Sequence, residues 1–324
     1  MINITNFSPI GFKNICDVFF GNLSWGIGWN TNNVALYIDN FLTQQYNNQL
    51  EIIKSPKNEV LTILCNHQSE VFTFLAKHVL KNISKSFVII SFGGDESFPN
   101  ETIEYCRDTN KNYYDMLIQS KYFKHWFAVN KVIQDDKRFT IIPYGLNYWS
   151  LTQSHWCGLN QCSIENQDIT MIEISNNALT FNKRIPKIYI NWHYNLSDAR
   201  HGDSRRKLQS ILPSNITYYA QNIPRTEYWK ECSKYTFVLS PHGNGLDCIR
   251  TWEALCLGCI VIVKKSAIDN LYDDLPVVIV NEWNEVNEQF LQKIILSFSE
   301  KKFNLNKLTM NYWIEKIYDI IKNL

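Results

Sequence analysis

Short apolar segments alternate with helix-like segments along most of the chain. Apolar runs of four to eight residues bounded by polar residues predict β-strands, and the amphipathic stretches between several of them predict helices. The predicted strands cover residues 59 to 65, 86 to 91 and 139 to 145 in the first half, and 187 to 194, 217 to 220, 235 to 240, 259 to 263 and 276 to 280 in the second. Continuous apolar strands between helices indicate two parallel sheets, each covered on both faces.

These two alternating runs predict an α/β protein with two doubly wound domains. Residues 150 to 186 have weak periodicity and many Asn, Gln and Ser, so a boundary belongs there. We place it at 165, which gives a first domain over residues 1–165 and a second over 166–305. Residues 306–324 contain a stripe of apolar positions at helical spacing, which predicts a packing helix at the end of the chain.

Composition and charge exclude several classes of protein. The 324 residues carry a formal net charge of +1, and their lysines are dispersed, so nucleic acid is not expected as a partner. No apolar run approaches the ~20 residues that span a bilayer, and the first 20 residues do not resemble a signal peptide. The nine Cys are scattered, as buried thiols in a reducing compartment are. We therefore expect a cytoplasmic protein without a membrane span.

One segment, "SPHGNGLDCIRTWEALCLGCIVIV" at residues 240 to 263, joins a strand to a helix through a glycine-rich turn. Gly243, Asn244 and Gly245 are followed by a helix that starts near Asp247. A turn of this kind leaves backbone N–H groups unpaired at the carboxyl end of a strand, where they can bind an anion such as phosphate. The third glycine of G-x-G-x-x-G is replaced by Cys248, so the turn is not by itself a dinucleotide fingerprint.

Arg250 and Glu253 lie three residues apart and share one face of that helix. A carboxylate there can accept hydrogen bonds from the vicinal hydroxyls of a ribose, and the arginine can pair with a phosphate. The alternative is an ordinary surface salt bridge between the two. A second polar cluster follows the strand at 187 to 194, where a solvated loop leading into a helix is the alternative to phosphate binding; it contains Asn191, Arg200, Arg205 and Arg206.

Three residues after strands of the first half are candidates for a general base. Gly93 and Gly94 allow a sharp turn that presents Asp95 and Glu96, and His67 follows the preceding strand. Asp95 is the first choice among them, because a structural role is the common one for a histidine in the position of His67.

Several motifs are missing from the sequence. There is no Asp-x-Asp to hold a divalent metal, no G-x-S-x-G and no second cysteine pair at zinc spacing beside Cys256 and Cys259. A dehydrogenase or epimerase is disfavoured, because lysines stand where a dinucleotide site needs an acidic residue. We expect neither a metal site nor a bound cofactor.

Taken together, these segments resemble the exostosin-like glycosyltransferases, and in particular short members without a membrane anchor. The resemblance rests on "SFGGDES", "HWFAVN", "IPYGLNYW", "YINWHYN" with Arg200, and above all on residues 240 to 263. It implies a GT-B fold, in which two Rossmann-like domains face across a cleft and a C-terminal helix crosses back to the first. It also implies a nucleotide-sugar donor, UDP- or GDP-linked, and a glycan acceptor.

The resemblance implies a role for each candidate residue as well. Glu253 would lie near the donor ribose and the turn at 243 to 245 along the diphosphate. Because the turn is the neutral "HGNG" where the family has arginines, the phosphate charge would be met by His242 or by Arg200, Arg205, Arg206 and Arg250. The expected activity is inverting, metal-independent glycosyl transfer. The alternative is a catalytically inactive GT-B-like module that binds sugar or protein.

Overall fold

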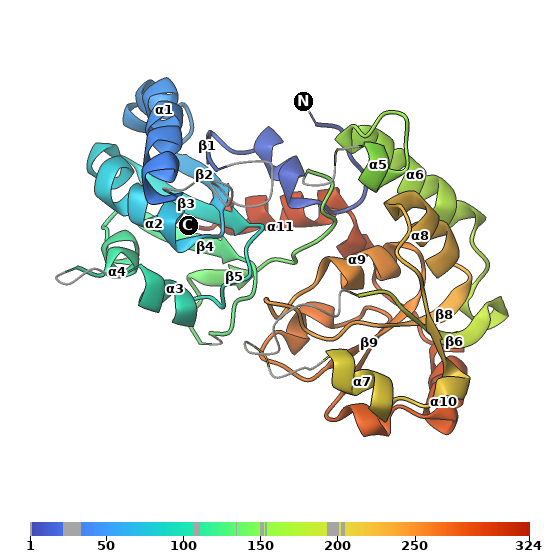
Figure 1. Ribbon diagram of the computed structural model, residues 1–324. Helices are drawn as coiled ribbons and strands as arrows, with labels where there is room; N and C mark the ends of the chain where they lie inside the picture. Colours follow the sequence, from blue (N-terminus) through green and yellow to red (C-terminus); the bar gives the residue numbers. More distant parts are fainter. Residues whose placement is uncertain are drawn as a thin grey trace. The chain divides into compact units, whose positions relative to one another are not determined.

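The chain divides into two compact units (Figure 1). The computed structural model describes residues 2–21, 34–106, 111–133, 135–149, 152, 154–192, 201 and 205–324. Unit 1 contains Met1–Ile2, Pro9–Tyr144 and Trp313–Leu324, and unit 2 contains Asn3–Ser8 and Gly145–Tyr312. Each unit is built on its own sheet.

Unit 1 has a five-stranded parallel sheet whose strands follow one another in sequence order. Since each crossover runs in the same direction, the connecting helices lie on one face of the sheet. The strands are β1 (Val18–Phe20), β2 (Val60–Asn66), β3 (Ser86–Phe92), β4 (Phe123–Ala128) and β5 (Phe139–Ile141), and the helices are α1 (Val34–Lys54), α2 (Ser69–Phe74), α3 (Asn100–Tyr105) and α4 (Tyr113–Ile118).

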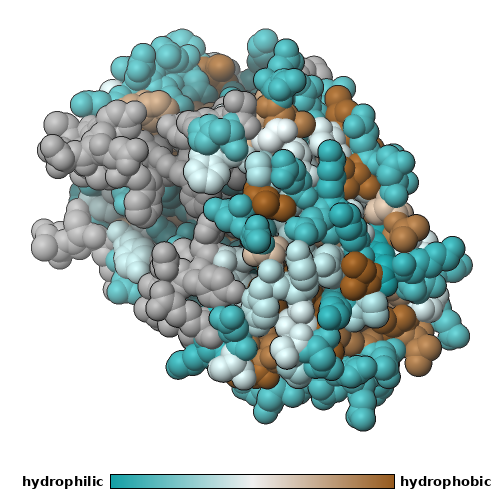
Figure 2. All heavy atoms as spheres, turned by 45° about the vertical axis from the view of Figure 1, so that its right-hand side comes forward, coloured by the Kyte–Doolittle hydropathy of each residue, from teal (hydrophilic) through white to brown (hydrophobic). Residues whose placement is uncertain are grey.

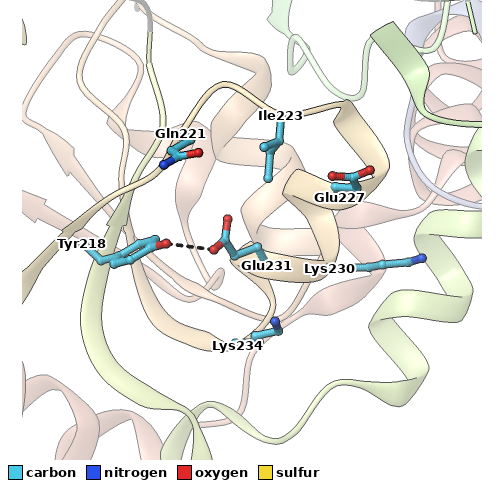
Figure 3. Close-up of a pocket in the computed structure, with 7 residues that line it drawn as sticks. All are labelled: Tyr218, Gln221, Ile223, Glu227, Lys230, Glu231 and Lys234. Carbon is cyan, nitrogen blue, oxygen red and sulfur yellow. Dashed lines mark hydrogen bonds between the residues drawn. The ribbon is translucent and has the colours of Figure 1, made fainter. Parts of the chain in front are cut away.

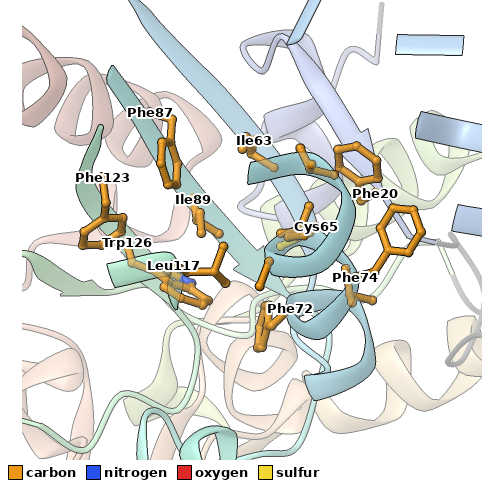
Figure 4. Packing of buried hydrophobic residues seen from close by; sticks show 14 of the residues in the cluster. Phe20, Ile63, Cys65, Phe72, Phe74, Phe87, Ile89, Leu117, Phe123 and Trp126 are labelled. Carbon is orange, nitrogen blue, oxygen red and sulfur yellow. The ribbon is translucent and has the colours of Figure 1, made fainter. Parts of the chain in front are cut away.

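The core of unit 1 is rich in aromatic side chains. Figure 4 shows residues of the strands, such as Ile63 and Ile89, packed against Phe72 and Phe74 of α2. Trp126 of β4 lies edge-on to Phe72, with ring centroids 4.9 Å apart. The alternate residues of β2 and β3 point to the opposite face and are also fully buried, so both faces of the central strands are covered.

Unit 2 has a five-stranded parallel sheet with the strand order β10-β9-β8-β6-β7, which changes direction once, between β8 and β6. Its strands are β6 (Ile185–Ile190), β7 (Thr217–Tyr219), β8 (Tyr235–Leu239), β9 (Ile260–Lys264) and β10 (Val277–Val280). Helices α7 (Arg205–Ile211) and α10 (Glu288–Ser299) cover one face, where Leu208 and Leu291 join the core cluster. Helices α8 (Arg225–Cys232) and α9 (Ile249–Cys256) lie on the other face (Figure 1). The unit is therefore a doubly wound α/β sandwich.

The remaining helices are α5 (Ser154–Cys157), α6 (Ile164–Asn177) and α11 (Met310–Lys322). Helix α11 has the apolar stripe expected from the sequence, and its residues from Trp313 onward group with unit 1. Trp313 and Ile317 are both 1% exposed.

An α/β fold with two parallel sheets is confirmed, and all eight predicted strands are present. Two strands were not predicted, β1 and β4, because β1 has three residues and Lys124 and His125 interrupt the apolar run of β4. The division of the chain falls after Tyr144, earlier than the expected boundary at residue 165. Residues just after it bond within unit 2, as the Gln167 side chain does to the carbonyl of Tyr148 at 3.0 Å. The cleft between two domains stays a prediction.

Hydrophilic residues predominate on the face shown in Figure 2, with hydrophobic residues scattered among them. Among the described residues, no helix combines the length and the apolar character needed to cross a lipid bilayer.

Candidate functional site

The strand order of unit 2 reverses between β6 and β8. These strands are neighbours, but the chain leaves β6 toward β7 on one side and leaves β8 toward β9 on the other. In open parallel sheets, ligands bind outside the carboxyl ends of the strands at such a switch point. The segments that follow the two strands carry Asn191 and the turn from His242 to Gly245, so the structure brings these predicted residues to one edge of the sheet.

The turn after β8 is closed by its own backbone and lies against an arginine. The Gly243 N–H donates to the Gly245 carbonyl at 3.1 Å. Arg205, which is buried at the start of α7, donates from Nη2 to the His242 carbonyl at 3.4 Å. A Cβ atom at Gly243 would come within 3.2 Å of the same Nη2. The turn is thus held beside a buried guanidinium, with Asn244 half-buried and Gly245 buried.

Arg250 connects α9 to the segment after β6. Its Nε donates to the Asn191 carbonyl at 2.9 Å, and its guanidinium lies 5.9 Å from the centre of the Trp192 ring. Its Nη1 is buried without a hydrogen-bond partner among the described residues. A buried, unpaired donor on a permanently charged group is costly, so this nitrogen is suited to an anionic oxygen brought by a ligand.

Asp247 serves the fold. Its carboxylate accepts hydrogen bonds from Trp252 Nε1 at 2.9 Å and from the Tyr272 hydroxyl at 3.2 Å, and it is 3% exposed. It also accepts from the N–H of Cys248, the residue before α9, at 2.8 Å. These contacts fix the start of α9 and explain why an acidic residue stands next to a turn proposed to bind anions.

Glu253 does not form the surface pair with Arg250 that was the alternative to ligand binding. It is 6% exposed, and its Oε1 accepts from Arg225 Nε at 2.9 Å and from Trp229 Nε1 at 3.1 Å. Arg225 Nη2 lies 2.8 Å from the same oxygen. The surface-bridge alternative is therefore wrong, because the carboxylate is buried and paired with a residue of α8. Whether Glu253 contacts a donor ribose stays a prediction.

Sequence reasoning missed Arg225 and its surroundings. The four-residue spacing of Arg225 and Trp229 places them on one helix face, which the sequence does show. Their pairing with Glu253 on another helix has no sequence signal. Tyr228 of the same helix has a buried hydroxyl without a partner among the described residues. Burial raises the pKa of Tyr228, the Glu253 charge raises it further and the Arg250 charge lowers it.

His67 lies inside the core of unit 1. It is 0% exposed, its Nδ1 lies 2.9 Å from Ser91 Oγ, and its Nε2 lies 3.2 Å from the carbonyl of Glu96. Burial lowers the pKa of His67 to about 3, so the ring is neutral at physiological pH. Both nitrogens are used within the fold, which is the structural role that the sequence left open.

Glu96 forms hydrogen bonds within unit 1. Asp95, the residue before it, is half-buried. The Glu96 carboxylate accepts from the N–H of Ser69 at 3.2 Å and from its hydroxyl at 2.6 Å, and so caps the start of α2. The loop before it needs its glycines, because Gly93 has φ of 72° and a Cβ at Gly94 would lie 1.8 Å from the His67 carbonyl oxygen.

Two predicted residues fall outside the described parts of the structure. Arg200 lies outside the described residues, as does the side chain of Arg206. The described part of the chain contains no group of three His, Cys, Asp or Glu side chains that could hold a metal ion.

A hollow of about 460 Å³ lies beside α8 and β7, apart from the predicted residues (Figure 3). The Tyr218 hydroxyl donates to Glu231 at 3.0 Å, and the lysines and glutamates of the lining balance in charge. It is lined by Tyr218, Gln221, Ile223, Glu227, Lys230, Glu231 and Lys234. None of the sequence motifs points to this hollow.

Comparisons with known proteins give distant likenesses only. No family profile and no curated protein matches the chain. Among solved structures, it is similar to WaaG, a glycosyltransferase involved in lipopolysaccharide biosynthesis, at 11% identity and a TM-score of 0.35 over 80% of this chain and 88% of that one. It is also similar to a trehalose-6-phosphate synthase, at 10% identity and 0.40 over 90% and 75%, and to an α1,3-fucosyltransferase, at 11% and 0.37 over 82% and 91%. At these TM-scores the likenesses carry no argument about activity.

Proposed function

We propose that this chain is a glycosyltransferase that moves a sugar from a nucleoside-diphosphate sugar to a hydroxyl of a glycan or other acceptor. One observation carries the proposal: at the switch point of a doubly wound sheet, Arg250 binds the segment after β6 and Arg205 binds the turn after β8. The resemblance of residues 240 to 263 to the exostosin-like family supports the choice of a nucleotide-sugar donor. A UDP- or GDP-linked donor and inverting, metal-independent chemistry belong to the same proposal.

In this proposal the diphosphate binds at the turn after β8. The backbone N–H groups of the turn and the unpartnered Nη1 of Arg250 would bind its oxygens, with the buried charge of Arg205 behind the turn. Negative charge builds on the nucleoside diphosphate as the bond to the sugar breaks. Donors fixed in advance around the leaving group stabilise that charge in the transition state.

Asp95 is the proposed general base. A carboxylate at a strand end of unit 1 would accept the proton of the acceptor hydroxyl as that oxygen attacks the anomeric carbon. Glu96 and His67 are not proposed for this step, because their polar atoms bond within unit 1.

Nucleotide affinity tests the donor site. UDP, GDP, CMP, ADP and NAD are titrated into the wild type and Arg250→Met by calorimetry. We expect one nucleoside diphosphate to bind the wild type and to lose at least about 10-fold in affinity in the variant, because a charge-assisted hydrogen bond is removed. Equal affinity of the two proteins would count against the site.

Lys230→Met is the matched control for this titration. It also removes one cationic side chain, but from the hollow beside α8. A loss of affinity in Lys230→Met and not in Arg250→Met would move the nucleotide site to that hollow.

Transfer is tested separately from binding. Asp95→Asn is expected to keep donor affinity and to lose both transfer and slow hydrolysis of the donor, whereas Glu96→Gln keeps turnover and loses about 1 kcal/mol of stability as a weaker helix cap. Turnover by Asp95→Asn at the wild-type rate would exclude Asp95 as the base.

A binding module without transferase activity is the second candidate. The observation that favours it is that two of the three candidate bases are engaged inside unit 1. Donor binding without any hydrolysis or transfer, across a panel of glycan acceptors, would support this function over the first.

A further inference from the structure

The hollow beside α8 and β7 lies apart from the proposed donor site. Helix α8 contributes buried Arg225 and Trp229 to the contact with Glu253, whereas its exposed residues Glu227 and Lys230 line the hollow. Residues three apart share one face of a helix, so the hollow has a face of α8 to itself. Its volume of about 460 Å³ falls within the range of small-molecule sites. The hollow therefore needs an explanation separate from the donor site.

Tyr218 supplies the hollow with an aromatic ring in a fixed position. It lies on β7, which is an edge strand of the sheet, and is 37% exposed. Its ring is stacked on that of Tyr235, with centroids 5.0 Å apart and an interplanar angle of 23°, and lies 5.8 Å from the ring of Tyr189. Both of these neighbours are buried. The ring is thus held by the core, and its exposed part borders the hollow.

The carboxylate of Glu231 is held beside that ring by two tyrosine hydroxyls. The Tyr218 hydroxyl donates to Oε1 at 3.0 Å, as Figure 3 shows, and the Tyr189 hydroxyl donates to Oε2 at 3.1 Å. Each carboxylate oxygen has two lone pairs, so each keeps one for a further donor. The carboxylate is therefore oriented in advance and can still accept hydrogen bonds from two neighbouring hydroxyls of a ligand.

The remaining polar groups favour a neutral ligand that is rich in hydroxyls. The charged residues of the lining are Glu227, Lys230, Glu231 and Lys234. Because two positive and two negative charges balance, a phosphate or another strongly charged group gains no net attraction. The Gln221 amide adds both donors and an acceptor. A sugar matches this lining, since its hydroxyls donate and accept while the C–H groups of its ring can pack on the aromatic ring of Tyr218.

We propose that this hollow is a carbohydrate-binding site, separate from the donor site, which holds a neutral segment of a glycan. Tyr218 packs against one sugar ring, and Glu231 and Gln221 bind its hydroxyls. The inference goes beyond the proposed function, because a transferase and a binding module could both use such a site. In a transferase, a glycan held there would raise the effective concentration of its acceptor end at the donor site.

Oligosaccharide affinity, measured by NMR titration without nucleotide, tests this. The probes are four neutral tetrasaccharides, maltotetraose, cellotetraose, mannotetraose and chitotetraose, and the acidic tetragalacturonate. We expect at least one neutral probe to bind the wild type and to bind Tyr218→Ala at least about 10-fold more weakly, because the apolar contact with the ring is lost. Tyr318→Ala is the matched control, since Tyr318 is also an exposed tyrosine but lies on α11, and it should bind as the wild type does.

Two further variants separate the ring from the carboxylate and cover the case in which Tyr218→Ala does not fold. Tyr218→Phe keeps the ring but releases Glu231 from one hydroxyl, so about a 3-fold loss of affinity is expected. Glu231→Gln replaces a charged acceptor by a neutral amide and should lose about 10-fold. Wild-type affinity in both of these variants would overturn the inference.

The outcomes separate this inference from the proposed function. Failure of all four neutral tetrasaccharides to bind the wild type overturns the inference and leaves the donor site standing, as does tighter binding of tetragalacturonate. Nucleotide affinity should be the same in the wild type and Tyr218→Ala. Competition between UDP or GDP and a bound tetrasaccharide would show that the hollow takes nucleotide instead, and would overturn the inference as well.

Discussion

The two sheets of this chain are both parallel, yet their strand orders differ. In unit 1 the strands follow one another in sequence order, and in unit 2 the order reverses between β6 and β8. At the strand ends of unit 1, His67, Ser91 and Glu96 bond to neighbouring parts of the same unit. At the reversal in unit 2, Arg250 keeps a buried nitrogen without a partner among the described residues.

The difference has a topological cause. In a consecutive parallel sheet every crossover runs in the same direction, and the loops at adjacent strand ends follow one another and can close over the edge. At a reversal the two chains diverge, which leaves a crevice between them. Polar residues at the strand ends thus serve packing in unit 1, whereas in unit 2 we propose that some of them bind a ligand.

The largest effect that we expect is on the stability of the loop after β3 in unit 1, which contains Gly93 and Gly94. Gly94→Ala would place a Cβ 1.8 Å from the His67 carbonyl oxygen, so the backbone of the loop must move. We expect a loss of about 3 kcal/mol in the free energy of unfolding, measured in urea. Gly243→Ala is the matched control in unit 2, where the nearest atom would be a side-chain nitrogen at 3.2 Å, and it should change stability by less than about 0.5 kcal/mol. Equal stabilities of the two variants would contradict the contrast.

Acid should also affect unit 1, through its buried histidines. Burial lowers the pKa of His67 from 6.5 to about 3, and that of His125 to about 4. Because the unfolded chain takes up protons below pH 6.5 that the folded unit does not, stability falls as the pH drops from 6.5 toward 4. At pH 5 His67 alone should cost about 2 kcal/mol.

Hydrogen exchange compared at pH 7 and pH 5, corrected for intrinsic exchange rates, measures this locally. Peptides of β2 and β3 should lose protection relative to those of β8 and β9. His67→Gln should reduce the loss, while His78→Gln, at an exposed position, should not. Unchanged protection of β2 at pH 5 would mean that His67 is protonated in the folded unit.

A smaller effect is expected at the turn of unit 2. Gly243→Ala brings a methyl group beside Arg205 Nη2 and onto the surface where we place the diphosphate. We expect about a 10-fold loss of nucleotide affinity with unchanged stability, measured by calorimetry and urea unfolding. If the affinity stayed the same, the diphosphate would have to bind elsewhere than at this turn.

The sequence predicted most of the fold because buried parallel strands are continuous apolar runs, which few other structures produce. It did not predict β4, because Lys124 and His125 stand within it, or α6, whose polar composition resembled a linker. Helix α6 is instead anchored through Gln167 to Tyr148 and Arg225, contacts that exist only in the folded unit.

The candidate site could be predicted in part for the same reason. Topology brings the ends of β6 and β8 together, so Asn191, Arg250 and the turn after β8 could be grouped from the strand pattern alone. Long-range pairing could not be predicted, because nothing local to Glu253 indicates that Arg225 binds it. The burial of His67 and Asp247 is likewise decided by distant residues, such as Ser91 and Tyr272.

The smallest expected effect concerns two tyrosine hydroxyls of unit 2. Tyr148 donates to Asp168 Oδ1 at 3.0 Å, so Tyr148→Phe should cost about 1 kcal/mol. The buried Tyr228 hydroxyl has no partner among the described residues, and Tyr228→Phe should leave stability unchanged or raise it by up to about 1 kcal/mol. Urea unfolding of the two variants without nucleotide measures the difference.

Nucleotide affinity of Tyr228→Phe sharpens the result. If this variant keeps its stability but loses nucleotide affinity, the hydroxyl contacts the ligand, and the site extends along α8 toward Arg225. If Tyr228→Phe loses stability as Tyr148→Phe does, the Tyr228 hydroxyl has a partner in the fold. The contrast between the bonded polar groups of unit 1 and the unpaired ones of unit 2 then does not hold at this position.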